Sequence, residues 1–151
     1  MLADHRGVAF HELTREIEHD TGMALAEMFE LHRQAGYRRF ERAALERLLA
    51  DPRRALIAAG GSIVAGAGTY GLSLANCFRA WMRASPEEHM SRVVKQGDLR
   101  PMQDNRQAIA DLKSNLDGRE QLYARADVEL DTVGNTVVRS FADLTRLVPE
   151  E

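Results

Sequence analysis

The sequence lacks the features that mark several classes of protein. It holds one cysteine in 151 residues, Cys77, which excludes an intrachain disulfide and predicts a reducing compartment, the cytoplasm. No apolar run approaches the roughly 18 residues of a membrane span, and the first residues do not form a signal peptide. The net charge of −3 gives no basic excess for nucleic acid. The five histidines are scattered, so a zinc site is not expected.

The sequence as a whole has the composition of an ordinary globular protein, with 44% hydrophobic and 28% charged residues. The length predicts a single domain over 1–151. Apolar or alternating runs predict strands at 8–13, 55–59, 78–84 and 128–132. Helical spacing and capping residues predict helices at 14–21, 25–51, 72–77, 85–95, 104–124 and 135–148. This alternation predicts a three-layer α/β/α fold with a parallel sheet.

A phosphate loop of the form G-x-x-x-x-G-K-[ST] does not occur anywhere in the sequence. That motif surrounds phosphates with consecutive backbone N–H groups and a lysine at the N-terminus of a helix. These 151 residues therefore lack the device on which many nucleotide-dependent kinases rely.

Six short motifs occur in order between Gly7 and Leu147: Phe10-His11-Glu12-Leu13-Thr14, the run 22–29, Tyr37-Arg38-Arg39-Phe40-Glu41, Gly60-Gly61-Ser62, Leu99-Arg100-Pro101-Met102 and Arg119-Glu120-Gln121-Leu122-Tyr123. In this order they resemble the motifs F-x-D-x-D, G-x-S-I-x-E-I-F, F-R-x-x-E, G-G-G, V-R-P-L and R-x-P-L-Y of the shikimate kinase family. The resemblance implies a P-loop-kinase-like fold with strand order 2-3-1-4-5. Strand 1 and its phosphate loop would be absent, so the domain over 1–151 is expected to be truncated at its N-terminus.

The resemblance also implies a set of ligand-binding residues: Thr14, Arg38, Gly60, Gly61, Ser62, Arg100 and Arg119. Arg38 and Arg119 match the arginines that hold the substrate carboxylate, and Arg100 matches the lid arginine that contacts phosphate. Planar guanidinium groups suit both kinds of anion. We expect the three arginines to line one cleft. At the glycine turn, Ser62 adds bulk in place of the third glycine.

Two departures from the family pattern weigh against catalysis. Thr14 replaces the aspartate that binds shikimate and helps to deprotonate its attacking hydroxyl, and a hydroxyl cannot act as that base. Glu12 replaces the aspartate that organises Mg²⁺, and it would bind metal only beside a phosphate loop. We therefore expect no catalytic residue and no cofactor in this chain, with ATP and Mg²⁺ bound only if the missing loop were present.

A narrower resemblance, carried by residues 84–90 and 96–102, is to the C-terminal domain of benzoyl-CoA-responsive transcriptional regulators. In these regulators of aromatic catabolism, a helix-turn-helix precedes a shikimate-kinase-like sensor. The resemblance implies an effector-sensing domain that binds a small-molecule anion, either an acyl-CoA such as benzoyl-CoA or a carboxylate. Such a domain would contact DNA only through an absent N-terminal domain. It could also pair with a second copy of itself as a homodimer, and no membrane contact is expected. The alternative is a divergent or truncated shikimate kinase that phosphorylates a substrate hydroxyl from ATP.

Each predicted site residue also has a plainer interpretation. Arg38 lies in an arginine-rich helix and could belong to a solvated face. Arg100 could be an ordinary surface side chain, and Arg119 could pair with Glu120 or with the helix end. The glycine turn could simply connect a strand to a loop, and Glu12 could be a surface carboxylate. Cys77, in an apolar run, is interpreted as a small hydrophobic residue rather than a nucleophile.

Overall fold

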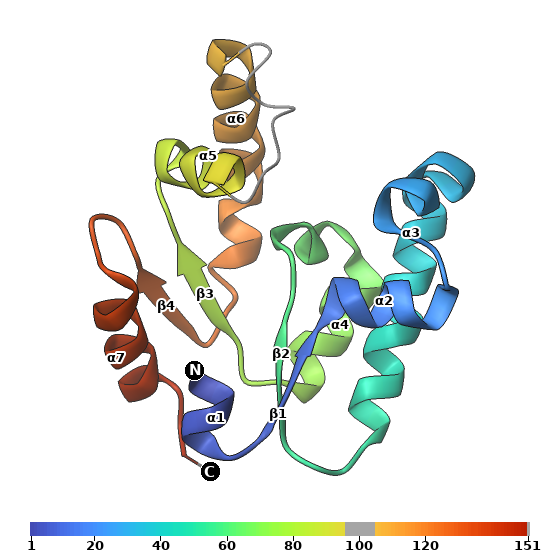
Figure 1. Ribbon diagram of the computed structural model, residues 1–151, viewed down its shortest axis with the longest axis horizontal. Coiled ribbons are helices and arrows are strands. Elements are labelled where there is room, and N and C mark those ends of the chain that lie inside the picture. The colour runs from blue at the N-terminus through green and yellow to red at the C-terminus, as the bar shows by residue number, and fades with distance from the viewer. Residues whose placement is uncertain (96–104, 151) are drawn as a thin grey trace. The chain divides into compact units, whose positions relative to one another are not determined.

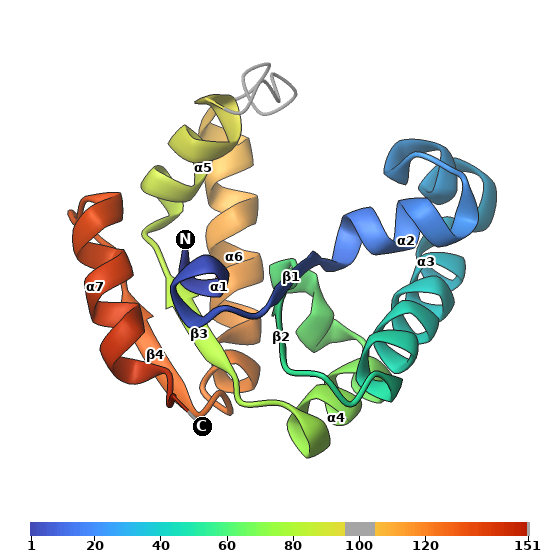
Figure 2. The same ribbon diagram turned by 60° about the horizontal axis from the view of Figure 1, so that its bottom comes forward.

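The computed structural model describes residues 1–95 and 105–150, which divide into two compact units. Unit 1 comprises Met1–Phe78 with Glu150, and unit 2 comprises Arg79–Pro149. Figures 1 and 2 show one strand pair and its helices in each unit. Within the described ranges, no helix has the length and apolar character needed to cross a membrane.

Unit 1 contains the strands β1 (Ala9–Glu12) and β2 (Ala55–Ala58), which pair in parallel. The register places Ala9 opposite Ala55 and Glu12 opposite Ala58. The helices of unit 1 are α1 (Leu2–Arg6), α2 (Leu13–Thr21), α3 (Leu25–Ala50), the 3₁₀ helix η1 (Gly61–Ala65) and α4 (Ala67–Asn76). Because α2 and α3 together connect β1 to β2, the strands can run in the same direction.

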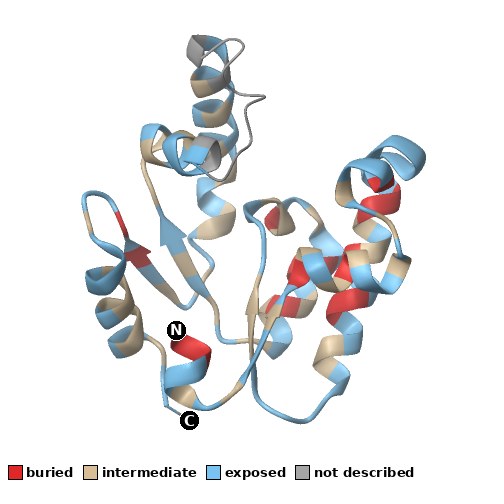
Figure 3. Cartoon of the chain, viewed as in Figure 1, coloured by how far each residue is buried: buried red, intermediate tan, exposed pale blue. Residues whose placement is uncertain are grey.

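The hydrophobic core of unit 1 lies where α2 meets α3, shown in red in Figure 3. Ile17 of α2 and Met28 of α3 are completely buried. The same cluster includes Leu13, Tyr37, Ala44 and Leu45. The apolar spacing that predicted these two helices is therefore explained by their shared buried face.

Unit 2 contains β3 (Ala80–Arg83) and β4 (Val128–Asp131), again parallel, with Ala80 opposite Val128. Its helices are α5 (Pro86–Lys95), α6 (Asn105–Tyr123) and α7 (Val137–Leu147). The predicted cap at Ser85 is confirmed, because the backbone N–H of Glu88 donates to Ser85 Oγ at 3.1 Å.

The predicted α/β architecture with parallel strands is confirmed. The pairs β1–β2 and β3–β4 are the neighbours expected for strands 2–3 and 4–5 of the order 2-3-1-4-5. Two details of the prediction are wrong. Ala55 of β2 is exposed and the rest of the strand is half-buried, whereas an uninterrupted apolar run such as 55–59 favours a strand buried on both faces. The helix α4 starts at Ala67 rather than at residue 72, since the glycines before Leu72 lower the helix propensity that the prediction used.

The helix α3 is interrupted at Arg33, whose backbone has φ 57° and ψ −173°. Among the described residues, Arg33 is the only one other than glycine with a positive φ. This backbone region is almost exclusive to glycine. The interruption accompanies the stacking of Phe29 on Tyr37, with ring centroids 4.7 Å apart. The sequence carried no sign of it, because arginine is a good helix former.

Replacing Arg33 with glycine should raise the free energy of unfolding by about 1 kcal/mol, because the strained backbone would relax. Urea denaturation followed by far-UV circular dichroism measures the change. Ala43→Gly is the matched control, and it should lower the free energy of unfolding by about 1 kcal/mol because it puts glycine at an exposed position in the regular part of α3. An Arg33→Gly variant that is no more stable than the parent would show that the strain is absent.

A charged network joins β1, α2 and α3. Arg47 Nη2 lies 2.6 Å from Glu16 Oε2, and Arg47 Nε lies 3.0 Å from Asp20 Oδ2. His11 Nδ1 lies 2.8 Å from the other oxygen of Glu16. Hydrogen bonding to Arg47, and then to His11, lowers the pKa of Glu16 below its ordinary 4.5.

The lowered pKa of Glu16 predicts a loss of stability in acid. Because the folded-state pKa lies below the unfolded value of 4.5, the network stabilises fully above that pH and loses its effect as the pH falls through the folded pKa. The stability difference between the parent and Glu16→Gln, measured in urea at several pH values, should therefore shrink in acid. Arg47→Gln should show the same convergence, and a pH-independent difference in both variants would contradict the prediction.

Candidate functional site

The candidate site in unit 1 is organised around Arg38 of α3. Arg38 Nη1 donates a hydrogen bond of 2.9 Å to Glu41 Oε1, one turn further along the helix. The Glu41 side chain is only 3% exposed and that of Arg38 is 18% exposed. A carboxylate this deeply buried requires a partner, so Glu41 fixes the place of the guanidinium group. Arg38 therefore does not belong to a solvated helix face.

Tyr37 and Thr14 extend this arrangement to α2. The Tyr37 ring lies under the guanidinium of Arg38, with 5.6 Å between Cζ and the ring centroid. Burial raises the pKa of Tyr37, and the charge of Glu41 raises it further, whereas Arg38 and the Thr14 hydroxyl act in the opposite direction. The Tyr37 phenol thus keeps its proton at neutral pH. Thr14 is half-buried at the start of α2.

Residues at the start of α4 also lie next to Arg38. A Cβ atom placed on Gly66 would lie 3.2 Å from Arg38 Cδ and 3.6 Å from both Glu41 Oε1 and Thr69 Oγ1. Thr69 is itself buried. We call these six residues the Arg38 cluster: Thr14, Tyr37, Arg38, Glu41, Gly66 and Thr69.

The glycine turn follows β2, at the carboxyl end of the strand, where α/β proteins commonly bind ligands. Gly60 has φ −67° and ψ 151°, which any residue can adopt. No atom of the described residues lies within 4 Å of a Cβ placed on Gly60. Neither the backbone nor the packing of unit 1 therefore requires glycine at position 60. Gly61 is exposed and Ser62 is half-buried in η1.

Glu12 does not form a metal site with the residues around it. It precedes α2, its side chain is 46% exposed, and Arg15 Nε lies 3.0 Å from its Oε2. Within 1–95 and 105–150, no group of three or more histidine, cysteine, aspartate or glutamate side chains is arranged to hold a metal ion. No chemical step is therefore assigned to a metal at Glu12.

The remaining predicted arginines lie elsewhere in the chain. Arg119 is half-buried in α6 of unit 2. Arg100 falls outside the described residues. The cleft lined by Arg38, Arg100 and Arg119 therefore stays a prediction.

Sequence reasoning missed four members of the Arg38 cluster: Tyr37, Glu41, Gly66 and Thr69. The spacing in F-R-x-x-E carried a signal for Glu41, because residues three apart on a helix are neighbours. No sequence signal marked Gly66, whose contact with Arg38 joins parts of the chain that are distant in sequence.

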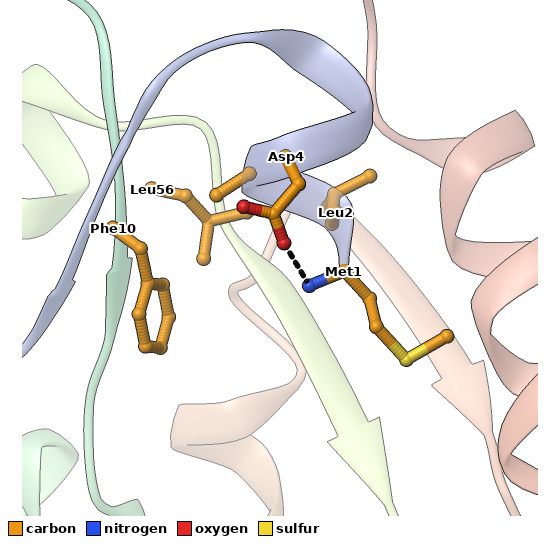
Figure 4. Close-up of a pocket in the computed structure, with 6 residues that line it drawn as sticks. Met1, Leu2, Asp4, Phe10 and Leu56 are labelled. Atoms are coloured by element: carbon orange, nitrogen blue, oxygen red, sulfur yellow. Dashed lines mark hydrogen bonds and ion pairs between the residues drawn. The ribbon is translucent and has the colours of Figure 1, made fainter.

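A separate hollow of about 150 Å³ lies between α1 and the strands of unit 1 (Figure 4). Its lining consists of Met1, Leu2, Ala3, Asp4, Phe10 and Leu56. The amino group of Met1 lies 2.8 Å from Asp4 Oδ2 at this place. The predicted ligand-binding residues are not among its described lining, so the hollow is not the candidate site.

Comparison with known proteins connects the chain to one family. The sequence model of that family, described as shikimate kinase, matches residues 1–147. The shikimate kinase of Thiobacillus denitrificans is 30% identical over 149 residues, which is 98% of this chain and 78% of the relative. The shikimate kinase of Parasynechococcus marenigrum is 28% identical over 148 residues, covering 98% of this chain and 76% of the relative.

Solved structures share the fold. A shikimate kinase from Acinetobacter baumannii in complex with shikimate matches with a TM-score of 0.81 and 23% identity, over 96% of this chain and 78% of that one. A shikimate kinase from Bacteroides thetaiotaomicron matches with a TM-score of 0.85 and 18% identity, over 97% and 86% of the two chains. At these identities, the likeness concerns the fold alone.

These findings overturn the expectation of an effector-sensing domain that binds benzoyl-CoA in a transcriptional regulator. That expectation depended on two short runs, 84–90 and 96–102, and the second lies outside the described residues. Matches over nearly the whole chain outweigh two short runs, and they are to shikimate kinases. The chain belongs to the shikimate kinase family.

Proposed function

We propose that this protein is a shikimate-kinase-type phosphotransferase and that unit 1 holds its acceptor, shikimate or a similar hydroxylated carboxylate. The observation that carries the proposal is the largely buried Arg38 guanidinium, fixed by Glu41 at 2.9 Å. A guanidinium group held in this way is ready to bind a carboxylate, because little side-chain freedom remains to be lost. Membership of the shikimate kinase family supports shikimate as the acceptor.

The glycine turn supports the same acceptor site. Glycine at position 60 leaves the backbone after β2 open to the close approach of a ligand. In the proposed site, the acceptor carboxylate meets Arg38 while its ring lies against Gly60 and Gly61. Ser62 and Thr14 supply hydroxyl groups that can bond to the hydroxyls of the acceptor.

Transfer of a phosphoryl group needs more than the acceptor site. ATP and Mg²⁺ are the cofactors of such a transfer, and a phosphate loop positions them. Since these 151 residues include no G-x-x-x-x-G-K-[ST] motif, we expect them to bind the acceptor. We expect transfer only where a phosphate loop is also supplied.

Calorimetric titration with shikimate tests the proposal. We expect saturable binding, and about tenfold weaker binding of shikimate methyl ester, because the ester lacks the charge that Arg38 recognises. Absence of binding at millimolar shikimate would contradict the proposal. Equal affinity for the acid and the ester would contradict the role of Arg38.

Replacing Gly60 with alanine should weaken shikimate binding about tenfold without reducing stability, because the added methyl group meets the ligand rather than the protein. Calorimetry and thermal denaturation measure the two effects. Gly71→Ala is the matched control, since no atom of the described residues lies within 4 Å of that Cβ position in α4. Wild-type affinity in Gly60→Ala would remove this turn from the site.

A further inference from the structure

We propose that Gly66 is a positioning residue for Arg38. Its missing side chain provides the space that the stem of Arg38 occupies when the guanidinium reaches Glu41. The proposal rests on the acceptor site described above. It adds the residue that precedes α4 to the support of that site.

The backbone of Gly66 does not explain why glycine is present. Its φ of −93° and ψ of 92° lie in the extended region, which other residues adopt. The neighbouring side chain does explain it. A Cβ atom on Gly66 would lie 3.2 Å from Arg38 Cδ, closer than ordinary van der Waals contact between carbon atoms.

Arg38 cannot easily move away from such an atom. Its side chain is 18% exposed, Glu41 holds its Nη1 at 2.9 Å, and the Tyr37 ring lies beneath its Cζ. Glu41 Oε1 and Thr69 Oγ1 would both lie 3.6 Å from the same Cβ, so these two atoms also occupy the space around the added methyl group. An added methyl group would therefore push the stem of Arg38 by a few tenths of an ångström and strain its bond to Glu41.

Gly68, in the same turn of α4, provides a contrast. A Cβ there would lie 2.7 Å from Arg42 Nη1, which is even closer. However, Arg42 is 52% exposed and its partner Glu46 is 49% exposed, so the end of this side chain can swing into solvent. Gly68→Ala thus adds the same methyl group beside an arginine that is free to move.

The first experiment compares the two alanine variants by calorimetry. We expect Gly66→Ala to weaken shikimate binding about tenfold and Gly68→Ala to leave it within about twofold of the parent. Gly66→Ala should leave the binding of shikimate methyl ester unchanged, because the ester does not use the charge of Arg38. Wild-type affinity for shikimate in Gly66→Ala, or an equal loss for acid and ester, would overturn the proposal.

The second experiment needs no ligand. Gly66→Ala should destabilise the parent but not an Arg38→Ala/Glu41→Ala background, in which the crowded side chains are gone. Urea denaturation of the four proteins measures this coupling. Equal destabilisation in both backgrounds would mean that Gly66 does not act through Arg38. If the parent protein fails to bind shikimate, the proposed function is wrong. The comparison of the four stabilities still decides whether Gly66 acts through Arg38.

Discussion

Replacing Arg38 with methionine should lower the free energy of unfolding by about 3 kcal/mol and abolish measurable shikimate binding. The stability loss arises because Glu41, 3% exposed, would keep a buried carboxylate without its partner. Methionine retains much of the apolar stem of arginine, so lost packing contributes little. The loss of binding follows from removal of the guanidinium group.

A second substitution separates these two effects. Arg38→Met/Glu41→Leu removes both charges and should recover most of the lost stability, since an apolar pair can replace a buried ion pair at little cost. It should not recover shikimate binding. Urea denaturation and calorimetry measure the two quantities. An Arg38→Met protein as stable as the parent, or a double variant that binds shikimate, would contradict this account of the pair.

Replacing Ile17 with alanine should lower the free energy of unfolding by about 3 kcal/mol, because it opens a cavity at a completely buried position. Ile17 belongs to the core cluster between α2 and α3, and both helices help to place the Arg38 cluster. Leu31→Ala is the control. Leu31 is 63% exposed in α3, so the same kind of truncation there should change the stability by less than about 0.5 kcal/mol.

The effect of Ile17→Ala must be measured with a probe that reports on the unfolding of unit 1. The single tryptophan, Trp81, lies in unit 2, so its fluorescence follows that unit. Hydrogen exchange at the backbone amides of α2 and α3 follows unit 1 directly. In Ile17→Ala these amides should exchange faster under native conditions. Unchanged protection there would show that Ile17 does not hold α2 against α3.

The sequence predicted those parts of the fold that depend on local signals. The predicted helix 14–21 ends where Gly22 adopts the left-handed conformation, with φ 67°. Ser85 caps α5 as predicted. Parallel pairing followed from the alternation of strands and helices. The helix ends are decided by a few neighbouring residues, and the parallel pairing by the order of strands and helices along the chain.

Features that depend on distant contacts were not predicted. The strained conformation of Arg33 occurs in a segment whose residues favour a continuous helix. The packing of the Arg38 stem against Gly66 brings together α3 and the residue before α4, and it has no local signature. In the site, the motif F-R-x-x-E pointed to Arg38 but not to the burial of Glu41, because burial depends on what packs against the helix face.

The Arg38 cluster draws all of its members from α2, α3 and the entry to α4, within unit 1. The residues of the Arg38 cluster are therefore encoded in one continuous stretch of the gene. Recombination can exchange that stretch as a block, and selection can refine it while the sequence of unit 2 stays constant.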